Sequence, residues 1–177
     1  MRRVPLAVLL AFASTAGLGQ DGVRVETYPV TGSTYGELIA SMRRAGPVAG
    51  DRGRRHYGIT EVGFRPNWTV RPGPGGCELV RAEVRASIRV VLPRWHERYR
   101  ATPALQERWA RLRDDIERHE NHHAAIAREW HARMIQRLNE PARARSCDRL
   151  NALMESKARE VLAAHRAAQL AFDGIGG

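Results

Sequence analysis

The most informative part of the sequence is residues 102–138, which read TPALQERWARLRDDIERHENHHAAIAREWHARMIQRL. Thr102 is a suitable N-cap, and Pro103 suits the first helical position. Apolar or histidine side chains then recur every three or four residues, as on one face of a helix: Leu105, Trp109, Leu112, Ile116, His119, His123, Ile126, Trp130, Met134 and Leu138. The pattern predicts one long helix that ends near Asn139-Glu140-Pro141.

A second helical pattern follows after a short connection. Ser146 is a plausible N-cap, and the apolar stripe continues to the end of the chain: Leu150, Met154, Ala158, Val161, His165, Ala168 and Phe172. A short loop makes consecutive helices antiparallel neighbours. We therefore predict a long antiparallel helical hairpin over residues 101–173.

The first half of the chain, residues 20–100, favours strands. Residues Val80–Val90 alternate apolar and charged side chains, which places all apolar groups on one face of a strand that ends at Leu92-Pro93. Val23–Val30 predicts another strand, and residues 57–70 predict two short ones. A short helix is expected over residues 34–44. The expected fold class is α+β, an antiparallel sheet with one covered face followed by the helical hairpin.

Residues 1–19 read MRRVPLAVLLAFASTAGLG and have the three parts of a secretory signal: basic, apolar and small. An uncleaved anchor would need a longer apolar core. We expect export to the periplasm or the medium, a single mature domain over residues 20–177, and no transmembrane helix after cleavage. The net charge is +10, but the basic residues are spread along the chain among acids, which argues against a specific nucleic-acid surface.

The chain has two cysteines, Cys77 and Cys147, both in the part expected to be exported. An even number of cysteines in an oxidising compartment favours a disulfide over two buried free thiols. Such a bond would close a loop of roughly 70 residues and stabilise the fold by ~4 kcal/mol in the chain-entropy model.

A catalytic metal site is predicted at residues 119–123, His-Glu-Asn-His-His, which match the pattern H-E-x-x-H. Residues four apart lie on one face of a helix, so His119 and His123 could bind one Zn²⁺ ion. Glu120 lies about 100° around the helix and could act as a general base toward a zinc-bound water. The competing interpretation is a pair of buried histidines that bond to backbone or carboxylate groups.

The third zinc ligand is expected on the second helix. If the turn centres near residue 144, His165 lies opposite His123 and Gln169 lies opposite His119. His165 is therefore the first candidate. A register slipped by one turn would instead favour Glu155, Glu160 or Asp173.

At this point the sequence resembles a bacterial family of predicted secreted zinc-dependent proteases with an H-E-x-x-H domain of unknown function. The matching segments include Met42–Pro47, Tyr57-Gly58-Ile59-Thr60, the H-E-x-x-H residues, and Gln169 with Phe172-Asp173. The resemblance implies a zincin-like metallopeptidase with ligands His119 and His123, the base Glu120 and a Cys77–Cys147 disulfide. The C-terminal His of that family is absent here, which leaves Asp173 or His165 to complete the site.

Three functions follow as hypotheses. The first is an exported zinc peptidase that hydrolyses peptide or protein substrates with Glu120 as base. The second is a non-catalytic zincin-like envelope protein that has lost a complete metal site, motivated by the altered C-terminus. The third, a polyanion binder, rests only on the net charge and predicts binding that weakens steeply with salt.

Overall fold

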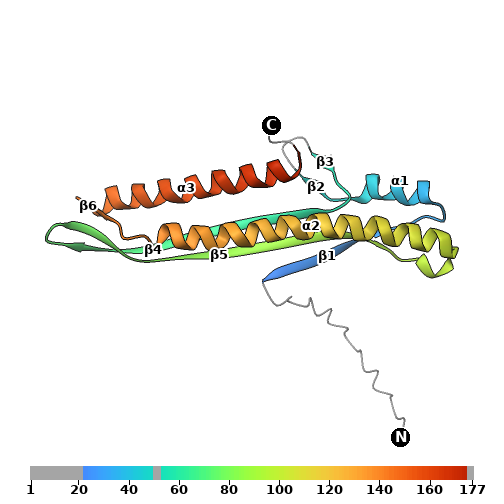
Figure 1. Cartoon of the computed structure of the whole chain (residues 1–177), viewed down its shortest axis with the longest axis horizontal. Coiled ribbons are helices and arrows are strands. Elements are labelled where there is room, and N and C mark those ends of the chain that lie inside the picture. The colour runs from blue at the N-terminus through green and yellow to red at the C-terminus, as the bar shows by residue number, and fades with distance from the viewer. Residues whose placement is uncertain (1–21, 50–52, 175–177) are drawn as a thin grey trace, which may run out of the picture.

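A computed structural model of the chain describes residues 22–49 and 53–174 (Figure 1). The expected signal segment, residues 1–19, lies outside the described residues. The elements follow in the order β1 (Val23–Val30), α1 (Tyr35–Ala45), β2 (Val48–Ala49), β3 (Arg54–Arg55), β4 (Ile59–Gly73), β5 (Gly76–Trp95), a 3₁₀ turn (Arg98–Arg100), α2 (Pro103–Leu138), β6 (Arg143–Ala144) and α3 (Cys147–Phe172).

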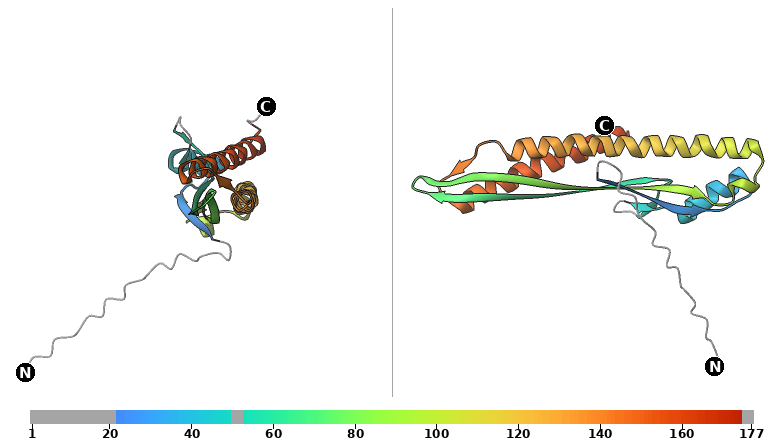
Figure 2. Two further views of the ribbon diagram at one scale, coloured as in Figure 1. Left: turned by 90° about the vertical axis from the view of Figure 1, so that its left-hand side faces the viewer. Right: turned by 90° about the horizontal axis from the view of Figure 1, so that it is seen from below.

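The protein is an elongated mixed α+β structure with two layers (Figures 1 and 2). β4 and β5 form a long hairpin, and the antiparallel helices α2 and α3 extend along one side of it. Residues of β5 that face the helices, such as Ala82 and Val84, are buried, while the intervening Arg81, Glu83 and Arg85 are exposed. The alternation read from the sequence therefore describes a sheet with one covered and one solvated face.

The sheet is mixed rather than antiparallel, which corrects the sequence prediction. β5 lies in the centre and pairs with β4 antiparallel, but with β1 parallel, from Val23 beside Ile88 to Val30 beside Trp95. The segment containing α1, β2 and β3 carries the chain from the end of β1 to the start of β4 on the other side of β5. β1 ends beside Trp95 and β4 starts beside Val91, so both lie near the C-terminal end of β5. β4 therefore runs opposite to β1, and its hairpin partner β5 runs parallel to β1.

The strands are also longer than predicted. Residues 59–73 form one strand instead of two short ones, and β5 continues through Leu92-Pro93 to Trp95. Proline can be accommodated in β4 because β4 is an edge strand, where a missing backbone donor need not interrupt the sheet. The proline and glycine residues in these segments therefore suggested more strand ends than the structure contains.

The core follows the long axis of the molecule as three clusters. One surrounds Trp95 and Trp109 near α1, and one contains Cys77, Met134 and Met154 at the far end. Between them, Ala124 and Ala127 of α2 pack against the centre of the sheet. These small side chains allow α2 to approach the sheet closely at the level where the candidate site lies.

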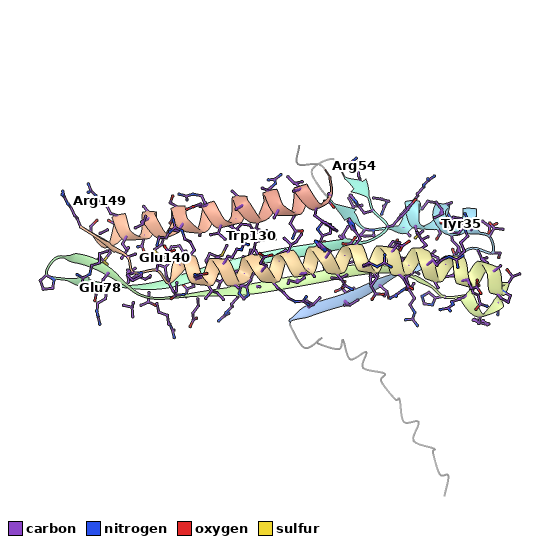
Figure 3. All side chains as sticks on the ribbon, in the orientation of Figure 1. Tyr35, Arg54, Glu78, Trp130, Glu140 and Arg149 are labelled. Atoms are coloured by element: carbon purple, nitrogen blue, oxygen red, sulfur yellow. A yellow bond between two sulfur atoms is a disulfide. The ribbon has the colours of Figure 1, made fainter. Side chains whose placement is uncertain are left out.

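The two ends of the molecule carry different elements. Tyr35, the first residue of α1, lies at one end, and Glu78 and Arg149 lie near the other (Figure 3). The predicted disulfide is confirmed at this second end: Cys77 of β5 is bonded to Cys147 of α3, with their Cα atoms 4.9 Å apart. The bond fixes the start of α3 against the sheet. Within the described part of the chain, no helix has the length and apolarity needed to span a bilayer.

Removing this disulfide should destabilise the protein substantially. We expect the double variant Cys77→Ala/Cys147→Ala to lose about 4 kcal/mol of unfolding free energy, because the bond restricts a 70-residue loop in the unfolded chain. Urea unfolding followed by circular dichroism measures this loss. The wild type under reducing conditions is the matched control and should unfold like the variant. An unfolding midpoint equal to that of the oxidised wild type would contradict the expectation.

Candidate metal centre

The middle of α2 has two buried or partly buried faces because the helix has two neighbours. Glu120 faces the sheet and is only 5% exposed, in line with Ala124 and Ala127. His119 and His123 instead face the C-terminal turn of α3, and their side chains are 47% and 12% exposed. The sequence placed both histidines in the buried stripe and Glu120 beside it. That prediction was wrong for His119, and it did not foresee the burial of Glu120, because a single-stripe analysis cannot distinguish the sheet-facing side from the side facing α3.

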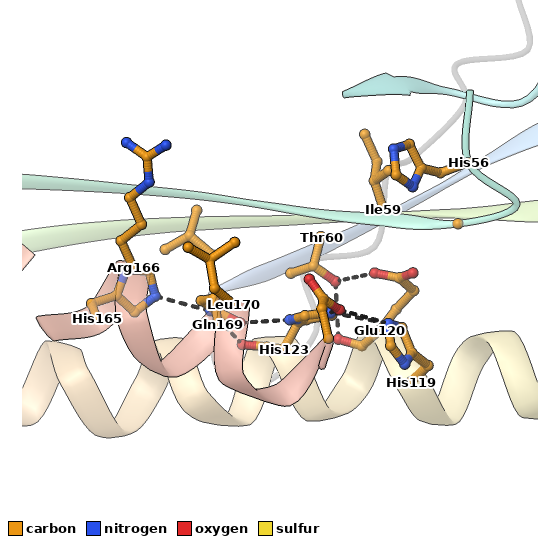
Figure 4. Close-up of a pocket in the computed structure, with 13 residues that line it drawn as sticks. His56, Ile59, Thr60, His119, Glu120, His123, His165, Arg166, Gln169 and Leu170 are labelled. Atoms are coloured by element: carbon orange, nitrogen blue, oxygen red, sulfur yellow. Dashed lines mark hydrogen bonds and ion pairs between the residues drawn. The ribbon is translucent and has the colours of Figure 1, made fainter. Parts of the chain in front are cut away.

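Three metal-ligating atoms converge between α2 and the end of α3. The Nε2 atoms of His119 and His123 lie 3.1 Å apart, and Oδ1 of Asp173 lies 3.3 Å and 3.0 Å from them, respectively. Figure 4 shows the two imidazoles pointing toward one another from successive turns of α2. In a tetrahedral zinc site with bonds of about 2.0–2.1 Å, neighbouring ligand atoms lie ~3.3 Å apart. The three atoms therefore have the spacing of three corners of such a site.

The register of the helical hairpin determines which residue completes this group. Gln169, not His165, lies opposite His123, so α3 is shifted by one turn from the first sequence expectation and Asp173 reaches the histidines. The connection is not a tight turn: it contains β6, which pairs with β5, and it ends at the disulfide-bonded Cys147. The other two candidates lie elsewhere, since Glu155 pairs with Arg159 and Glu160 pairs with Arg137.

Gln169 connects His123 and His165 through a hydrogen-bond network that fixes the orientation of its own side-chain amide. Its side-chain nitrogen donates to the backbone carbonyl of His123 at 3.2 Å, which fixes the orientation of the amide. The amide oxygen then lies 2.5 Å from Nδ1 of His123 and must accept a proton from it. His123 therefore carries a proton at Nδ1, and its Nε2 is the ring nitrogen that faces His119 and Asp173.

His165 supports Gln169 from the other side. Its Nε2 lies 2.9 Å from the Gln169 side-chain nitrogen and accepts the second amide proton. Burial lowers the pKa of His165, so the ring is neutral near pH 7, as an acceptor must be. The ring also packs edge-on against Phe64, with centroids 5.0 Å apart. His165 thus contacts the network and not the group of three ligand atoms.

The resulting charges favour a cation at the centre. With the Nδ1 proton of His123 donated to Gln169, the other ring nitrogen, Nε2, lies 3.0 Å from a carboxylate oxygen of Asp173. Two lone pairs at this distance repel unless a proton or a metal ion lies between them. Imidazole nitrogen and carboxylate oxygen are both ordinary zinc ligands, so the donor set fits Zn²⁺.

Glu120 is held beside this group by the start of β4. The Thr60 hydroxyl lies 2.8 Å from Oε2 of Glu120 and 2.9 Å from its backbone carbonyl. No hydrogen-bond partner of Oε1 is found among the described residues. A Cβ atom on Gly58 would lie 3.0 Å from Oε1 and 2.7 Å from Ile116, so only glycine allows this close approach of strand and helix.

A pocket of about 370 Å³ opens onto the group (Figure 4). α2 contributes His119, Glu120 and His123 to its wall, β4 contributes apolar and hydroxyl side chains, and α3 contributes residues from His165 to Asp173. Phe172 packs against the rings of His119 and His123, with centroids 4.9 Å away from each. This aromatic contact holds the last turn of α3, and with it Asp173, over the histidines.

Comparison with known families identifies the chain. The model of a family described as "Bacterial protein of unknown function (DUF922)" matches residues 25–176. The chain belongs to this family. No curated protein and no solved structure matches it. The family description assigns no activity, so the zinc-dependent protease function suggested by the resemblance stays a prediction.

Sequence reasoning about this DUF922 protein missed two residues that shape the site. In the sequence, Thr60 and Gly58 stand only within the segment Tyr57-Gly58-Ile59-Thr60, and nothing there predicts a role for either. Gly58 lies in a bend just before β4, and a glycine can mark a place where two backbone elements approach closely. Gln169 was placed near the site, but its contacts with His123 depend on the exact register of α3.

Replacing Gln169 should weaken metal binding by the DUF922 protein without unfolding it. In Gln169→Leu the Nδ1 proton of His123 loses its acceptor, and partners of this kind commonly contribute 10–100-fold to metal affinity. Competition with a chromogenic chelator measures zinc affinity, and a thermal melt reports stability. Gln136→Leu, an exposed site on α2, is the matched control. Equal zinc affinities for the two variants would show that the contact does not affect the ligand.

Proposed function

We propose that this protein is an exported zinc-dependent peptidase in which His119, His123 and Asp173 bind one Zn²⁺ ion and Glu120 is the general base. The observation that supports this most is the convergence of three ligand atoms at 3.0–3.3 Å beside a buried carboxylate. The Cys77–Cys147 disulfide agrees with export, because such bonds persist mainly in oxidising compartments.

The proposed chemistry divides between the metal and Glu120. A bound zinc ion lowers the pKa of its water and polarises a carbonyl group. Glu120 would accept the proton of the attacking water at Oε1, since Oε2 is already engaged by Thr60, and would pass it to the leaving amine. The Thr60 hydroxyl orients the carboxylate, and Gly58 keeps it accessible from the strand side.

The edge of β4 supports a peptide as substrate. β4 pairs with β5 on one side and with no other described strand on the other, and its residues Ile59, Thr60 and Val62 line the pocket. An extended peptide could therefore add to this edge through backbone hydrogen bonds. Its backbone would then run past Glu120, and its alternate side chains would point into the pocket.

Metal analysis and a chelation test would examine this proposal. The purified chain from residue 20 onward should contain one zinc ion per molecule and cleave an unfolded protein substrate. A chelator should abolish the cleavage, and added zinc should restore it. A chain that binds no zinc would contradict the proposal. Stoichiometric zinc without any cleavage would favour the alternative, a non-catalytic envelope protein.

A further inference from the structure

One face of α3 contributes a row of side chains to the pocket. Arg166, Leu170 and Asp173 follow one another at spacings of four and three residues, so they lie on the same side of the helix. Arg166 precedes Asp173 by seven residues, or two turns, which is about 10 Å along the helix axis. Figure 4 shows the Arg166 side chain extending from α3 toward the level of β4.

Arg166 differs from most arginines on the two long helices because it has no acidic partner. Arg113, Arg133 and Arg159 each pair with a glutamate four residues away on the same helix. The residues three and four positions from Arg166 are Leu162, Ala163, Gln169 and Leu170, none of which is acidic. Among the described residues, Arg166 forms no ion pair or hydrogen bond.

Arg166 is also the only lysine or arginine among the described residues that line this pocket. Its guanidinium group is permanently charged and can bind both oxygens of a carboxylate at once. An unpaired guanidinium at the rim of a substrate pocket therefore has the chemistry to select substrates that carry a carboxylate.

We propose that Arg166 binds a carboxylate group of the peptide substrate. This inference rests on the proposed peptidase function. The 10 Å distance along α3 corresponds to about three residues of an extended peptide, at ~3.3 Å per residue. The carboxylate is therefore expected about three residues from the cleaved bond. It could be an Asp or Glu side chain or the C-terminus of a short peptide.

The wall between Arg166 and the metal ligands suggests a second preference. Leu170 is 37% exposed, and it lines the pocket together with Ile59 and Val62 of β4. On α3, Leu170 lies between Arg166 and Asp173, and Ile59 and Val62 of β4 line the same pocket. A substrate with an apolar residue between the cleaved bond and the carboxylate would bury that residue against Leu170.

Peptide binding to the zinc-loaded variant Glu120→Gln tests the inference without turnover. Two pairs of peptides are compared by calorimetry: one pair has Glu or Gln at the third residue from the intended bond and an amidated C-terminus. The other pair has Gln at that position and either a free or an amidated C-terminus. We expect about tenfold tighter binding for the carboxylate member of one pair. The pair that shows the difference identifies the source of the carboxylate.

The difference should disappear in Arg166→Gln and be partly restored in Arg166→Lys, since lysine keeps the charge but not the paired donors. Arg159→Gln is the matched control on α3, because it removes the same charge from an exposed site that does not line the pocket. Equal affinities within both peptide pairs would overturn the inference. The same loss in Arg159→Gln would also overturn it, since it would reveal only a general effect of net charge.

Two further measurements separate this inference from the proposed function. If the wild type cleaves acidic and neutral peptides equally well, Arg166 has no such role while the peptidase function stands. If the wild type cleaves neither, the peptidase function fails. The NMR signal of the Arg166 Nε–Hε group then shows whether Arg166 still binds a carboxylate. A shift of this resonance with the carboxylate peptide, but not with its neutral counterpart, supports the carboxylate site. Identical spectra with both peptides reject it.

Discussion

Glu120→Gln is expected to abolish peptide hydrolysis while zinc remains bound. The amide retains the shape of the side chain, and its oxygen can still accept the hydrogen bond from Thr60, but it cannot take a proton from water. Loss of a general base typically reduces the rate by 10²–10⁴-fold. Steady-state cleavage of an unfolded protein, together with metal analysis of the same sample, measures both effects.

Glu129→Gln provides the matched control for this experiment. It makes the same chemical change on α2, at an exposed residue whose partner is Arg133. We expect its activity to equal that of the wild type. If Glu120→Gln retained full turnover, the proposed mechanism would have to be abandoned, whether or not zinc is present.

Asp173→Ala should remove zinc from the protein, and His165→Ala should not. Asp173 contributes an oxygen 3.0–3.3 Å from both histidine nitrogens, whereas His165 contacts only the amide of Gln169. Losing one of three protein ligands is expected to lower zinc affinity at least as much as losing an orienting contact, by 100-fold or more. Competition with a chromogenic chelator gives the two affinities directly.

The same experiment decides between the two candidate third ligands. His165→Ala should lower the zinc affinity only slightly, since Gln169 keeps its bonds to His123. Glu155→Ala, which removes a distant carboxylate from α3, should leave it unchanged. A large loss in His165→Ala with a small loss in Asp173→Ala would show that the ion is bound by His165, which would require α3 to shift by one turn.

Several features of the fold could be predicted because they depend on neighbours in sequence. The start of α2 at Thr102-Pro103, its end near Asn139 and the cap of α3 at Ser146 all follow from local capping chemistry. The two-residue alternation in β5 correctly predicted the buried side chains of Ala82, Val84, Ile88 and Val90. It was wrong for Val80, which is exposed at a shift in strand register, and for Ala86, which is also exposed. The disulfide followed from the presence of just two cysteines in the chain.

Other features depend on contacts between distant segments, and there the predictions were incomplete. The parallel pairing of β1 with β5 depends on the path of the chain through α1, which no periodicity reveals. The burial of Glu120 depends on α2 having neighbours on two sides. An apolar stripe shows that a helix packs against something, but not how many partners it has.

The sequence alone determined the long helices, the covered sheet face, the disulfide and the His119-Glu120-His123 spacing, because each depends on short-range spacing or on the number of cysteines. The tertiary structure decided the direction of β1, the contacts of Thr60 and Gly58 with Glu120, and the approach of Asp173 rather than His165 to the histidines. A shift of α3 by one turn, which leaves its own periodicity unchanged, moves a different side chain to the site. Contacts along the hairpin select one register, including the disulfide at one end and the packing of Phe172 at the other.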